Sequence, residues 1–411
     1  MEKKHLVVVT RGYPYNTEEL SFLTQELEVL KEYYHILIIA KFTVEERSPE
    51  DCEYPYVACV NKFSLPSALF FLARTFLDIR VWKEMWILIS KRRFTFGGIR
   101  HVVSECFFSK NFEKTLKRCI RDIPKEEEIV FYSYWYDYSL LALTKLKRSN
   151  SKLITRMHGF DLYNERCPWG CQCFKEQLEE KIDRIVFISE YGKDYYRKNF
   201  AKPETNASKL VVNYLGVRQQ EYMSYQAHDE LILVSCSSLI PLKRVDKIIE
   251  ALSLIDDISI TWTHIGDGSS KESILEYAHA LLDHKDNVRY IFTGYLESKD
   301  VMEYYRNNYF DYYILLSDTE GLPVSIMEAM SFGVPAIASD VGGVGEIVDA
   351  ENGQLIRNTE NAEEVALALR RLYALSKDEV YNMRKHAFET WEHEFNARTN
   401  AGKLVAMLDE I

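Results

Sequence analysis

Short apolar runs alternate with longer amphipathic stretches along the whole chain. Such runs, bounded by turn residues, are typical of strands buried on both faces of a parallel sheet. The runs begin at His5, His35, Glu128, Lys152, Arg184 and Lys209 in the first half, and at Glu230, Ile258, Asn287, Phe310, Val334 and Gly353 in the second. Helical patterns, such as those over 18–34 and 244–255, lie between them. This alternation predicts βαβ units and an α/β fold.

A polar stretch from Arg218 to Glu230 separates two series of predicted strands. A chain of 411 residues is also longer than one hydrophobic core usually supports. We therefore predict two Rossmann-like domains, over 1–217 and 218–391. Doubly wound sheets bind ligands at the carboxyl ends of their strands, so a cleft between two facing domains is the expected active site.

The composition narrows the class of protein. Hydrophobic residues make up 47% and charged residues 27%, as in a folded soluble protein, and the net charge of −11 argues against nucleic acid as the main partner. The apolar run near the N-terminus is too short for a signal peptide, and no run of about 18 uncharged apolar residues exists. Eight cysteines without a secretory signal fit a reducing compartment, so we expect a cytoplasmic protein.

One region departs from the acidic average. Residues 60–124 contain 13 lysines and arginines against 5 acids, and 63–90 is more apolar than a surface helix needs. One interpretation is a pair of core helices. The other, which the basic charges favour, is a surface within 63–121 that contacts an anionic membrane at its inner face, with Lys91, Arg92 and Arg93 against the headgroups. Contact with an anionic acceptor would explain the same charges.

The stretch 310–348 contains the strongest candidate chemistry. A predicted strand ends at Ser317, a loop with Glu320 follows, and Pro323 stands where a first helical turn tolerates proline. The free amides of a helix start attract phosphate, and Glu328, one to two turns further on, is placed to accept hydrogen bonds from a ribose diol. Glu320 is placed to reach sugar hydroxyls. Either glutamate alone would be taken as a solvated side chain, but the whole arrangement favours a donor site.

The same stretch resembles a known family. Its E-x7-E spacing, with Gly-Leu-Pro after the first glutamate and the loop VGGVGEIV beyond it, is similar to the signature of glycosyltransferase family 4. Segments GYPYNTEELSFLTQELEVL, HGFD, FISEYGKDYY, SSLIPLKRVDKIIEAL, HIGDGS and FTGYL resemble other parts of that family, so the likeness covers nearly the whole chain. The chain end from Trp391 resembles the family's last helix, which implies that about 392–411 joins the N-terminal domain.

The resemblance implies the GT-B fold and a retaining glycosyltransferase. Such an enzyme moves a sugar from a nucleoside-diphosphate sugar, with UDP favoured over GDP, to a hydroxyl of a glycan, a glycolipid, a lipid-linked acceptor or a polysaccharide. It implies no cofactor, no metal ion and no covalent intermediate. Two alternatives stay open: a sugar-nucleotide 2-epimerase on the same architecture, and a catalytically weak sugar-nucleotide-binding subunit.

The resemblance also implies roles for individual residues. Glu320, His158 and Lys243 would act at the reacting sugar and the leaving diphosphate, and Glu328 would bind the ribose. The other donor-binding positions that it implies are Gly12, Asn16, Thr17, Asp161, Ser238, Arg244, Gly266, Gly294, Tyr295, Gly321, Leu322, Pro323, Val324, Gly342 and Gly343. A fixed cation and helix amides aimed at a departing diphosphate would lower the barrier.

One position departs from the family pattern. The lysine-bearing loop has Ser238 where the family usually has arginine, and Arg244 where glycine is common. Arg244 is therefore the candidate replacement for the missing cation. A separate cluster, Cys167, Cys171 and Cys173, raises the possibility of zinc with His158, but three cysteines in one loop lack the paired spacing of structural zinc sites, so we expect free thiols near the acceptor entrance.

Overall fold

A computed structural model describes residues 3–15, 17–42, 52–58 and 64–411. The chain divides into two compact units, one of Met1–Tyr214 with Ala401–Ile411 and one of Leu215–Asn400. The second break falls later than the predicted 391/392 boundary. The reason is local pairing: Val217 bridges Asn396, and the Asn400 side chain donates to the Leu215 carbonyl, so these segments stay together in unit 2.

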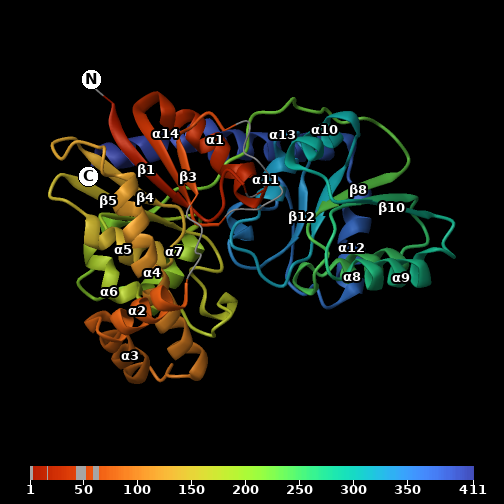
Figure 1. Ribbon diagram of the computed structural model, residues 1–411. Helices are drawn as coiled ribbons and strands as arrows, with labels where there is room; N and C mark the ends of the chain where they lie inside the picture. The colour runs from red at the N-terminus through yellow and green to blue at the C-terminus, as the bar shows by residue number, and fades with distance from the viewer. Residues whose placement is uncertain (1–2, 16, 43–51, 59–63) are drawn as a thin grey trace. The chain divides into compact units, whose positions relative to one another are not determined.

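Unit 1 is built on a parallel sheet of seven strands in the order β3-β2-β1-β4-β5-β6-β7 (Figure 1). The strands are β1 (Lys4–Thr10), β2 (Tyr34–Ala40), β3 (Tyr56–Ala58), β4 (Ile129–Ser133), β5 (Ser151–Met157), β6 (Arg184–Phe187) and β7 (Leu210–Val212). All but β3 correspond to the apolar runs of the sequence. The edge strand β3 was not predicted, because three residues are too few to show a strand pattern.

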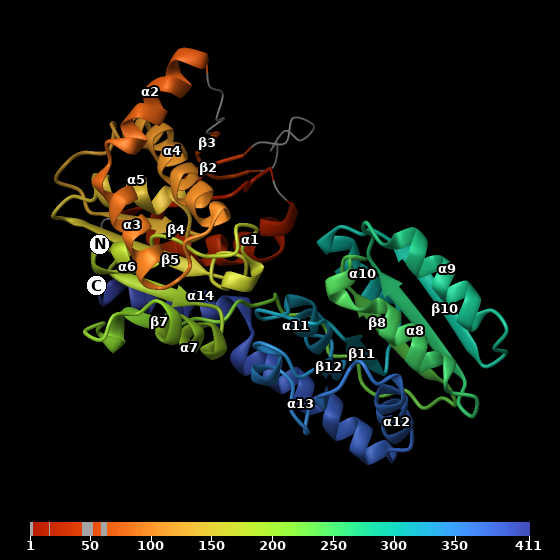
Figure 2. The same cartoon turned by 90° about the horizontal axis from the view of Figure 1, so that it is seen from below.

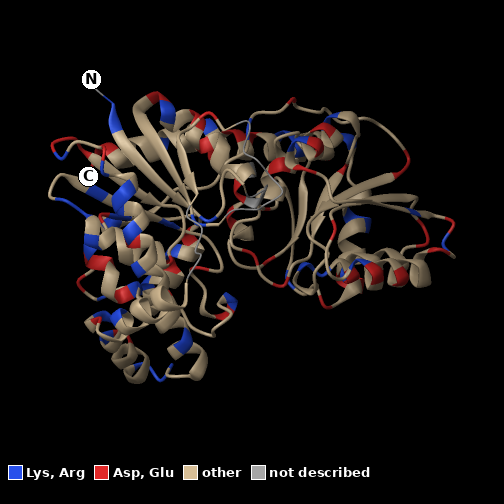
Figure 3. Ribbon diagram, in the orientation of Figure 1, with Lys and Arg blue, Asp and Glu red and all other residues tan. Residues whose placement is uncertain are grey.

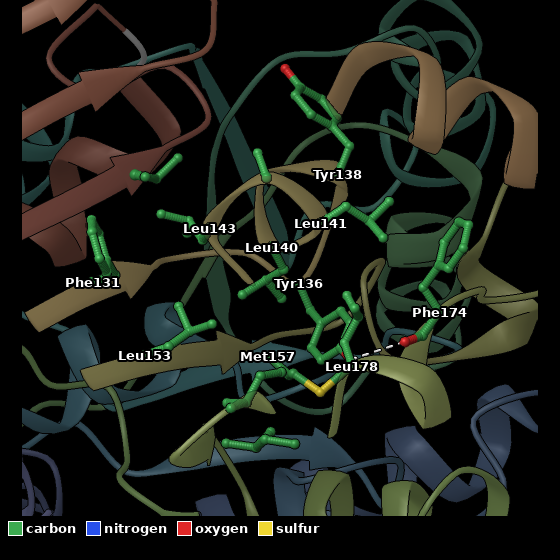
Figure 4. Packing of buried hydrophobic residues seen from close by; sticks show 14 of the residues in the cluster. Phe131, Tyr136, Tyr138, Leu140, Leu141, Leu143, Leu153, Met157, Phe174 and Leu178 are labelled. Carbon is green, nitrogen blue, oxygen red and sulfur yellow. Dashed lines mark hydrogen bonds between the residues drawn. The ribbon is translucent and has the colours of Figure 1, made fainter. Parts of the chain in front are cut away.

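Helices cover both faces of this sheet. Alternate residues of β1 enter different cores: Leu6 and Val8 pack with α1 (Thr17–Tyr33) and α14 (Ala397–Asp409), whereas Val7 and Val9 join the core on the opposite face. The second core is formed with α3 (Ile79–Ser90), α4 (Phe96–Cys119), α5 (Tyr138–Leu146), α6 (Lys175–Leu178) and α7 (Glu190–Asn199). Figure 4 shows part of it around α5, where the Tyr136 hydroxyl donates to the Phe174 carbonyl.

A helical hairpin extends from the α4 side of unit 1, as Figures 1 and 2 show. It consists of α2 (Leu65–Phe76) and α3, and both helices pack on α4. Proline at the second position of α2 and the Asp78 side chain, which accepts from the Arg80 amide, define the two helix starts. Within the described ranges, no helix is long and apolar enough to cross a lipid bilayer.

Unit 2 contains a six-stranded parallel sheet in the order β10-β9-β8-β11-β12-β13. The strands are β8 (Leu231–Cys236), β9 (Ile260–Ile265), β10 (Val288–Gly294), β11 (Tyr312–Leu315), β12 (Ala336–Ser339) and β13 (Gly353–Ile356). The core on one face includes α8 (Val245–Ser253), α9 (Lys271–Leu282) and α12 (Ala362–Tyr373), and the remaining helices are α10 (Ser298–Asn307), α11 (Val324–Met330) and α13 (Lys377–Glu394).

Each sheet has a point where the strand order reverses. In unit 1 the reversal lies between β1 and β4, and in unit 2 between β8 and β11. The loops that leave the carboxyl ends of these strand pairs diverge there, which makes the reversal the usual ligand position in doubly wound folds. Most of the predicted site residues lie on these loops or on those of neighbouring strands.

Candidate donor and sugar sites

In unit 2 the structure brings Lys243 and Glu320 together at the reversal point. Lys243 ends the 3₁₀ turn Pro241–Lys243 after β8, and its Nζ donates to Glu320 Oε1 at 2.6 Å from the loop after β11. The Asp318 amide also donates to the Leu242 carbonyl, at 3.0 Å, so the backbones of the two loops are tied together. Glu320 is nearly buried, which makes this a fixed charge pair rather than a solvated one.

A second loop closes on Glu320 from the end of β12. Gly342 has a φ of +57°, and a Cβ there would lie 1.8 Å from the Glu320 carbonyl oxygen, so only glycine fits. The next amide, that of Gly343, donates to the Gly321 carbonyl at 3.1 Å. The two predicted glycines therefore bring the second loop against the 320–323 segment.

Helix α11 begins directly after this contact. It starts at Val324, one residue after the predicted Pro323, which occupies the N-cap position. No side chain caps the first turn, and Leu322 is buried just before it. The Ile326 amide donates to the Pro323 carbonyl at 3.2 Å, so the amides that an anionic group would satisfy are those of Val324 and Ser325, beyond the carboxyl end of β11.

Glu328 lies on α11 as a partly buried carboxylate. Burial raises its pKa to about 7, and no hydrogen-bond or ion-pair partner is found for it within the described part of the chain. A carboxylate without partners in an apolar setting favours a ligand that supplies hydroxyl donors.

The loops after β9 and β10 are joined through two glycines. The Gly266 amide donates to the Gly294 carbonyl at 2.9 Å, and both residues have positive φ. A Cβ on Gly266 would lie 1.9 Å from the Ser237 carbonyl oxygen, so the loop after β8 lies close to it as well. Tyr295 follows with a ring that is more than half exposed and therefore open to a planar ligand.

The Arg244 guanidinium is held in ion pairs within unit 2. Its guanidinium donates to Asp318 at 2.9 Å and forms further ion pairs with Glu360 and Asp246. These carboxylates compensate its charge and raise its pKa, chiefly through Glu360. Ser238 is exposed in the neighbouring loop. Arg244 therefore fastens the loops after β8, β11 and β13 to one another, and its role as the replacement cation stays a prediction.

In unit 1, His158 and Asp161 follow β5 and belong to one turn. Asp161 Oδ1 accepts from the His158 amide at 2.8 Å, and Oδ2 accepts from the Tyr136 amide at 3.0 Å. Burial raises the pKa of Asp161 to about 6. The supporting role predicted for Asp161 is thus exerted on the backbone of the turn.

The His158 imidazole is enclosed by aromatic rings. The Trp135 ring lies 4.1 Å from it and the Tyr134 ring 5.0 Å, between centroids. Burial, followed by the charge of Arg156, holds the pKa of His158 well below its usual range. Both ring nitrogens are buried without a hydrogen-bond partner among the described residues, so the neutral ring offers one donor and one acceptor to a ligand.

The loop after β1 differs from the prediction. The Gly12 amide does not face open space but donates to Glu19 Oε2 at 2.6 Å, and the amides of Arg11 and Tyr13 donate to the same carboxylate. The amides expected to border phosphate are therefore occupied by an internal anion. Of the other predicted residues of this loop, Asn16 lies outside the described residues, and Thr17 is the first residue of α1.

Glu19 and Trp135 were not predicted as site residues. Glu19 is fully buried, and besides the three amides it accepts from the Trp135 indole nitrogen, whose ring lies against His158. A signal was present: Glu19 falls four residues before Leu23 and eight before Leu27, on the core face of α1. An acid on the core face of an amphipathic helix predicts a buried partner.

The three clustered cysteines are buried free thiols. Cys167 Sγ donates to the Cys171 carbonyl at 3.1 Å and lies 3.7 Å from His101 Nδ1, not near His158. Across the residues that the structure describes, no group of three or more His, Cys, Asp and Glu side chains is placed to hold a metal ion.

Comparison with known families places the match in unit 2. Residues 219–389 match the family model described as glycosyl transferases group 1. An uncharacterized glycosyltransferase of Methanocaldococcus jannaschii is 29% identical over 52% of this chain and 56% of its own length, so the chain spans about half of that relative. The amylovoran biosynthesis glycosyltransferase AmsK of Erwinia amylovora is 25% identical over 70% of this chain and 71% of its own.

A solved structure resembles the chain over its full length. The Anabaena protein HepE, in complex with UDP and glucose, aligns with a TM-score of 0.67 over 100% of both chains at 14% identity. The two Rossmann-like sheets and this structural similarity show that the chain has the GT-B fold, as predicted from the sequence.

Proposed function

We propose that the protein is a retaining glycosyltransferase that moves a sugar from a nucleoside-diphosphate sugar to a hydroxyl of a glycan, glycolipid or polysaccharide. The observation on which this rests is the Lys243–Glu320 pair, 2.6 Å apart beside the uncapped start of α11. Relatives named for glycosyl transfer support the reaction class. The HepE structure, solved in complex with UDP and glucose, supports a UDP-sugar as donor.

In this proposal the donor phosphates bind between Lys243 and the first turn of α11. Departure of the nucleoside diphosphate builds negative charge, which the Lys243 ammonium and the helix amides stabilise more strongly than they stabilise the bound donor. Glu328 accepts from the ribose hydroxyls, and Tyr295 with the loops at Gly266 and Gly294 borders the base.

The sugar meets the remaining groups. In unit 2, Glu320 accepts from sugar hydroxyls and is paired with Lys243. In unit 1, the neutral ring of His158 offers one donor and one acceptor to a hydroxyl group. Retention follows if the acceptor attacks on the face from which the diphosphate leaves and the leaving phosphate takes the acceptor proton. No residue of this chain acts as a nucleophile in that scheme, and we expect turnover to persist when divalent metal ions are chelated.

The site has little positive charge for binding a diphosphate. This favours one alternative function, that of a weak or non-catalytic sugar-nucleotide-binding subunit. Ser238 has no charge, and the guanidinium of Arg244 is compensated by carboxylates. The purified protein is incubated with a panel of UDP- and GDP-sugars. Release of free diphosphate supports transfer, interconversion of the sugar supports an epimerase, and binding without turnover supports the weak subunit.

Variants of the charge pair test the site itself. Lys243→Ala and Glu320→Gln should each lower turnover on the order of 100-fold or more, since each removes a charged group aimed at the reacting region. The matched controls are Lys385→Ala and Glu389→Gln, which alter another lysine–glutamate pair of unit 2, 3.5 Å apart on α13. Unchanged activity in the first two variants would refute the assignment of this site.

A further inference from the structure

The α2–α3 hairpin exposes an apolar stripe on each of its helices. Side chains at helical spacing face solvent, namely Leu65, Leu69, Leu72 and Phe76 on α2 and Ile79, Trp82, Trp86 and Ile89 on α3. Trp86 is 70% exposed and Leu69 59%. Single exposed apolar residues are ordinary, but two adjacent stripes on one hairpin mark an interaction surface.

These stripes are additional to the faces that hold the hairpin on unit 1. Phe71 and Thr75 of α2 and Val81 and Leu88 of α3 are buried on other sides of their helices. The Trp82 indole nitrogen donates to the Phe76 carbonyl at 2.8 Å, which joins the two stripes where the helices meet. Each helix is therefore anchored on unit 1, and the two stripes meet where α2 passes into α3.

Both acidic side chains of 64–100 are engaged within unit 1. Asp78 forms an ion pair with Arg80 at 2.9 Å and another with Lys110, and Glu84 accepts from the Phe174 amide at 2.7 Å. The exposed basic residues of the same segment are Arg74, Lys83, Lys91, Arg92 and Arg100. Figure 3 shows this hairpin mostly tan with basic segments. The outward surface is thus apolar and basic, with no exposed acid between residues 64 and 100.

We propose that the α2–α3 hairpin docks the protein on the surface of a membrane that carries anionic lipid headgroups. Each helix has 12 residues, or about 18 Å, against about 30 Å of hydrocarbon, so the hairpin lies in the interface and does not span it. Tryptophan suits that interface because its ring is apolar and its nitrogen is polar. A second copy of the chain would bring like charges together at this surface, whereas anionic headgroups complement them.

The structure shifts the contact away from the Lys91–Arg93 cluster of the sequence prediction. Lys91 Nζ donates to Glu176 at 2.5 Å, and Arg93 donates to Asn199 and lies over the Phe200 ring. Two of the three basic residues are therefore occupied within unit 1. We expect the exposed Lys83 of α3 and the exposed Arg74, which lies over the ring of the exposed Phe70, to contact the headgroups instead.

Flotation with phosphatidylcholine vesicles containing about 30% phosphatidylglycerol tests this proposal. The wild-type protein should float at low salt, and the double variant Leu69→Ser/Trp86→Ser should lower the bound fraction about tenfold or more. Arg74→Glu/Lys83→Glu should also lower it, with an effect that fades at high salt. Leu367→Ser/Tyr373→Ser, which changes two exposed side chains of α12, is the matched control and should float like the wild type.

Several outcomes would overturn the proposal: a wild-type protein that stays at the bottom at low salt, equal loss in the control, or a dimer in light scattering that Leu69→Ser/Trp86→Ser dissociates. Circular dichroism melting confirms that the variants fold. The inference rests on the proposed function in one respect: it places the proposed enzyme at a lipid surface. Flotation requires no activity, and diphosphate release from a soluble donor should be unchanged in Leu69→Ser/Trp86→Ser, so the two proposals fail separately.

Discussion

The reversal points of the two sheets have the same topology, and their polar groups are paired differently. In unit 1, the amides after β1 converge on the buried carboxylate of Glu19. In unit 2, the corresponding position contains Lys243 and the uncapped start of α11, with Gly342 allowing the loops to approach. A helix start and loop amides attract an anion only where the protein has not supplied one.

The two units therefore favour different chemical groups of a ligand in our proposal. The phosphates belong to unit 2, where no side chain caps the start of α11 and Lys243 shares its charge with Glu320. Unit 1 offers the neutral imidazole of His158 among aromatic rings, a surface suited to sugar hydroxyls and ring faces.

The strongest effect should come from Glu19→Ala in unit 1. The variant leaves three backbone amides and the Trp135 indole without their acceptor, and buried donors of this kind each cost about 1–3 kcal/mol. We expect the free energy of unfolding to fall by about 3–5 kcal/mol in denaturant titration. Glu276→Ala, at an exposed position of α9, is the control and should change it by less than about 0.5 kcal/mol. A small effect of Glu19→Ala would show that these amides have another acceptor.

Gly342→Ala is the matching test in unit 2. The added Cβ would overlap the Glu320 carbonyl at a positive φ, so the loops must separate. We expect donor turnover to fall about 100-fold, with a loss of stability of about 1–3 kcal/mol. Gly345→Ala is the control, because its nearest neighbour lies at an ordinary 3.6 Å. Equal behaviour of the two variants would contradict a role for the close approach at Gly342.

A smaller, pH-dependent effect is expected at Glu328. Burial raises its pKa to about 7 from a usual value of 4.5, so the folded protein holds this proton where the unfolded chain has lost it. Its contribution to stability is therefore fully present below pH 4.5 and is lost as pH rises through 7. Glu328→Gln should stabilise the protein above pH 7 by about 1–3 kcal/mol, measured by denaturant titration at several pH values.

The ionisation of Glu328 should also change the affinity for nucleotides. If ribose hydroxyls donate to the ionised carboxylate, the affinity for a nucleoside diphosphate rises with pH through 7 in the wild type and less so in Glu328→Gln. Comparison with the variant removes the contribution of the ligand's own phosphate titration. Identical pH profiles of nucleotide affinity in the wild type and in Glu328→Gln would show that Glu328 does not bind the ribose.

Much of the fold followed from the sequence because its signals are local. Each predicted apolar run forms a strand, and the spacing from Glu320 to Glu328 places a loop and a helix as expected. The contacts that decided the site are not local. Glu19 meets Trp135, and Arg244 meets Asp318 and Glu360, across long stretches of chain, so the occupation of the Gly12 amide and the compensation of Arg244 required the tertiary structure.

In our proposal the nucleotide diphosphate binds at the reversal point of unit 2. Calorimetric titration of UDP and GDP into the wild-type protein, Lys243→Ala and His158→Ala tests this position. We predict that the preferred nucleotide binds Lys243→Ala about tenfold or more weakly, because one charge-assisted hydrogen bond is lost, and binds His158→Ala within about twofold of the wild type. Loss of binding in His158→Ala together with unchanged affinity in Lys243→Ala would contradict it.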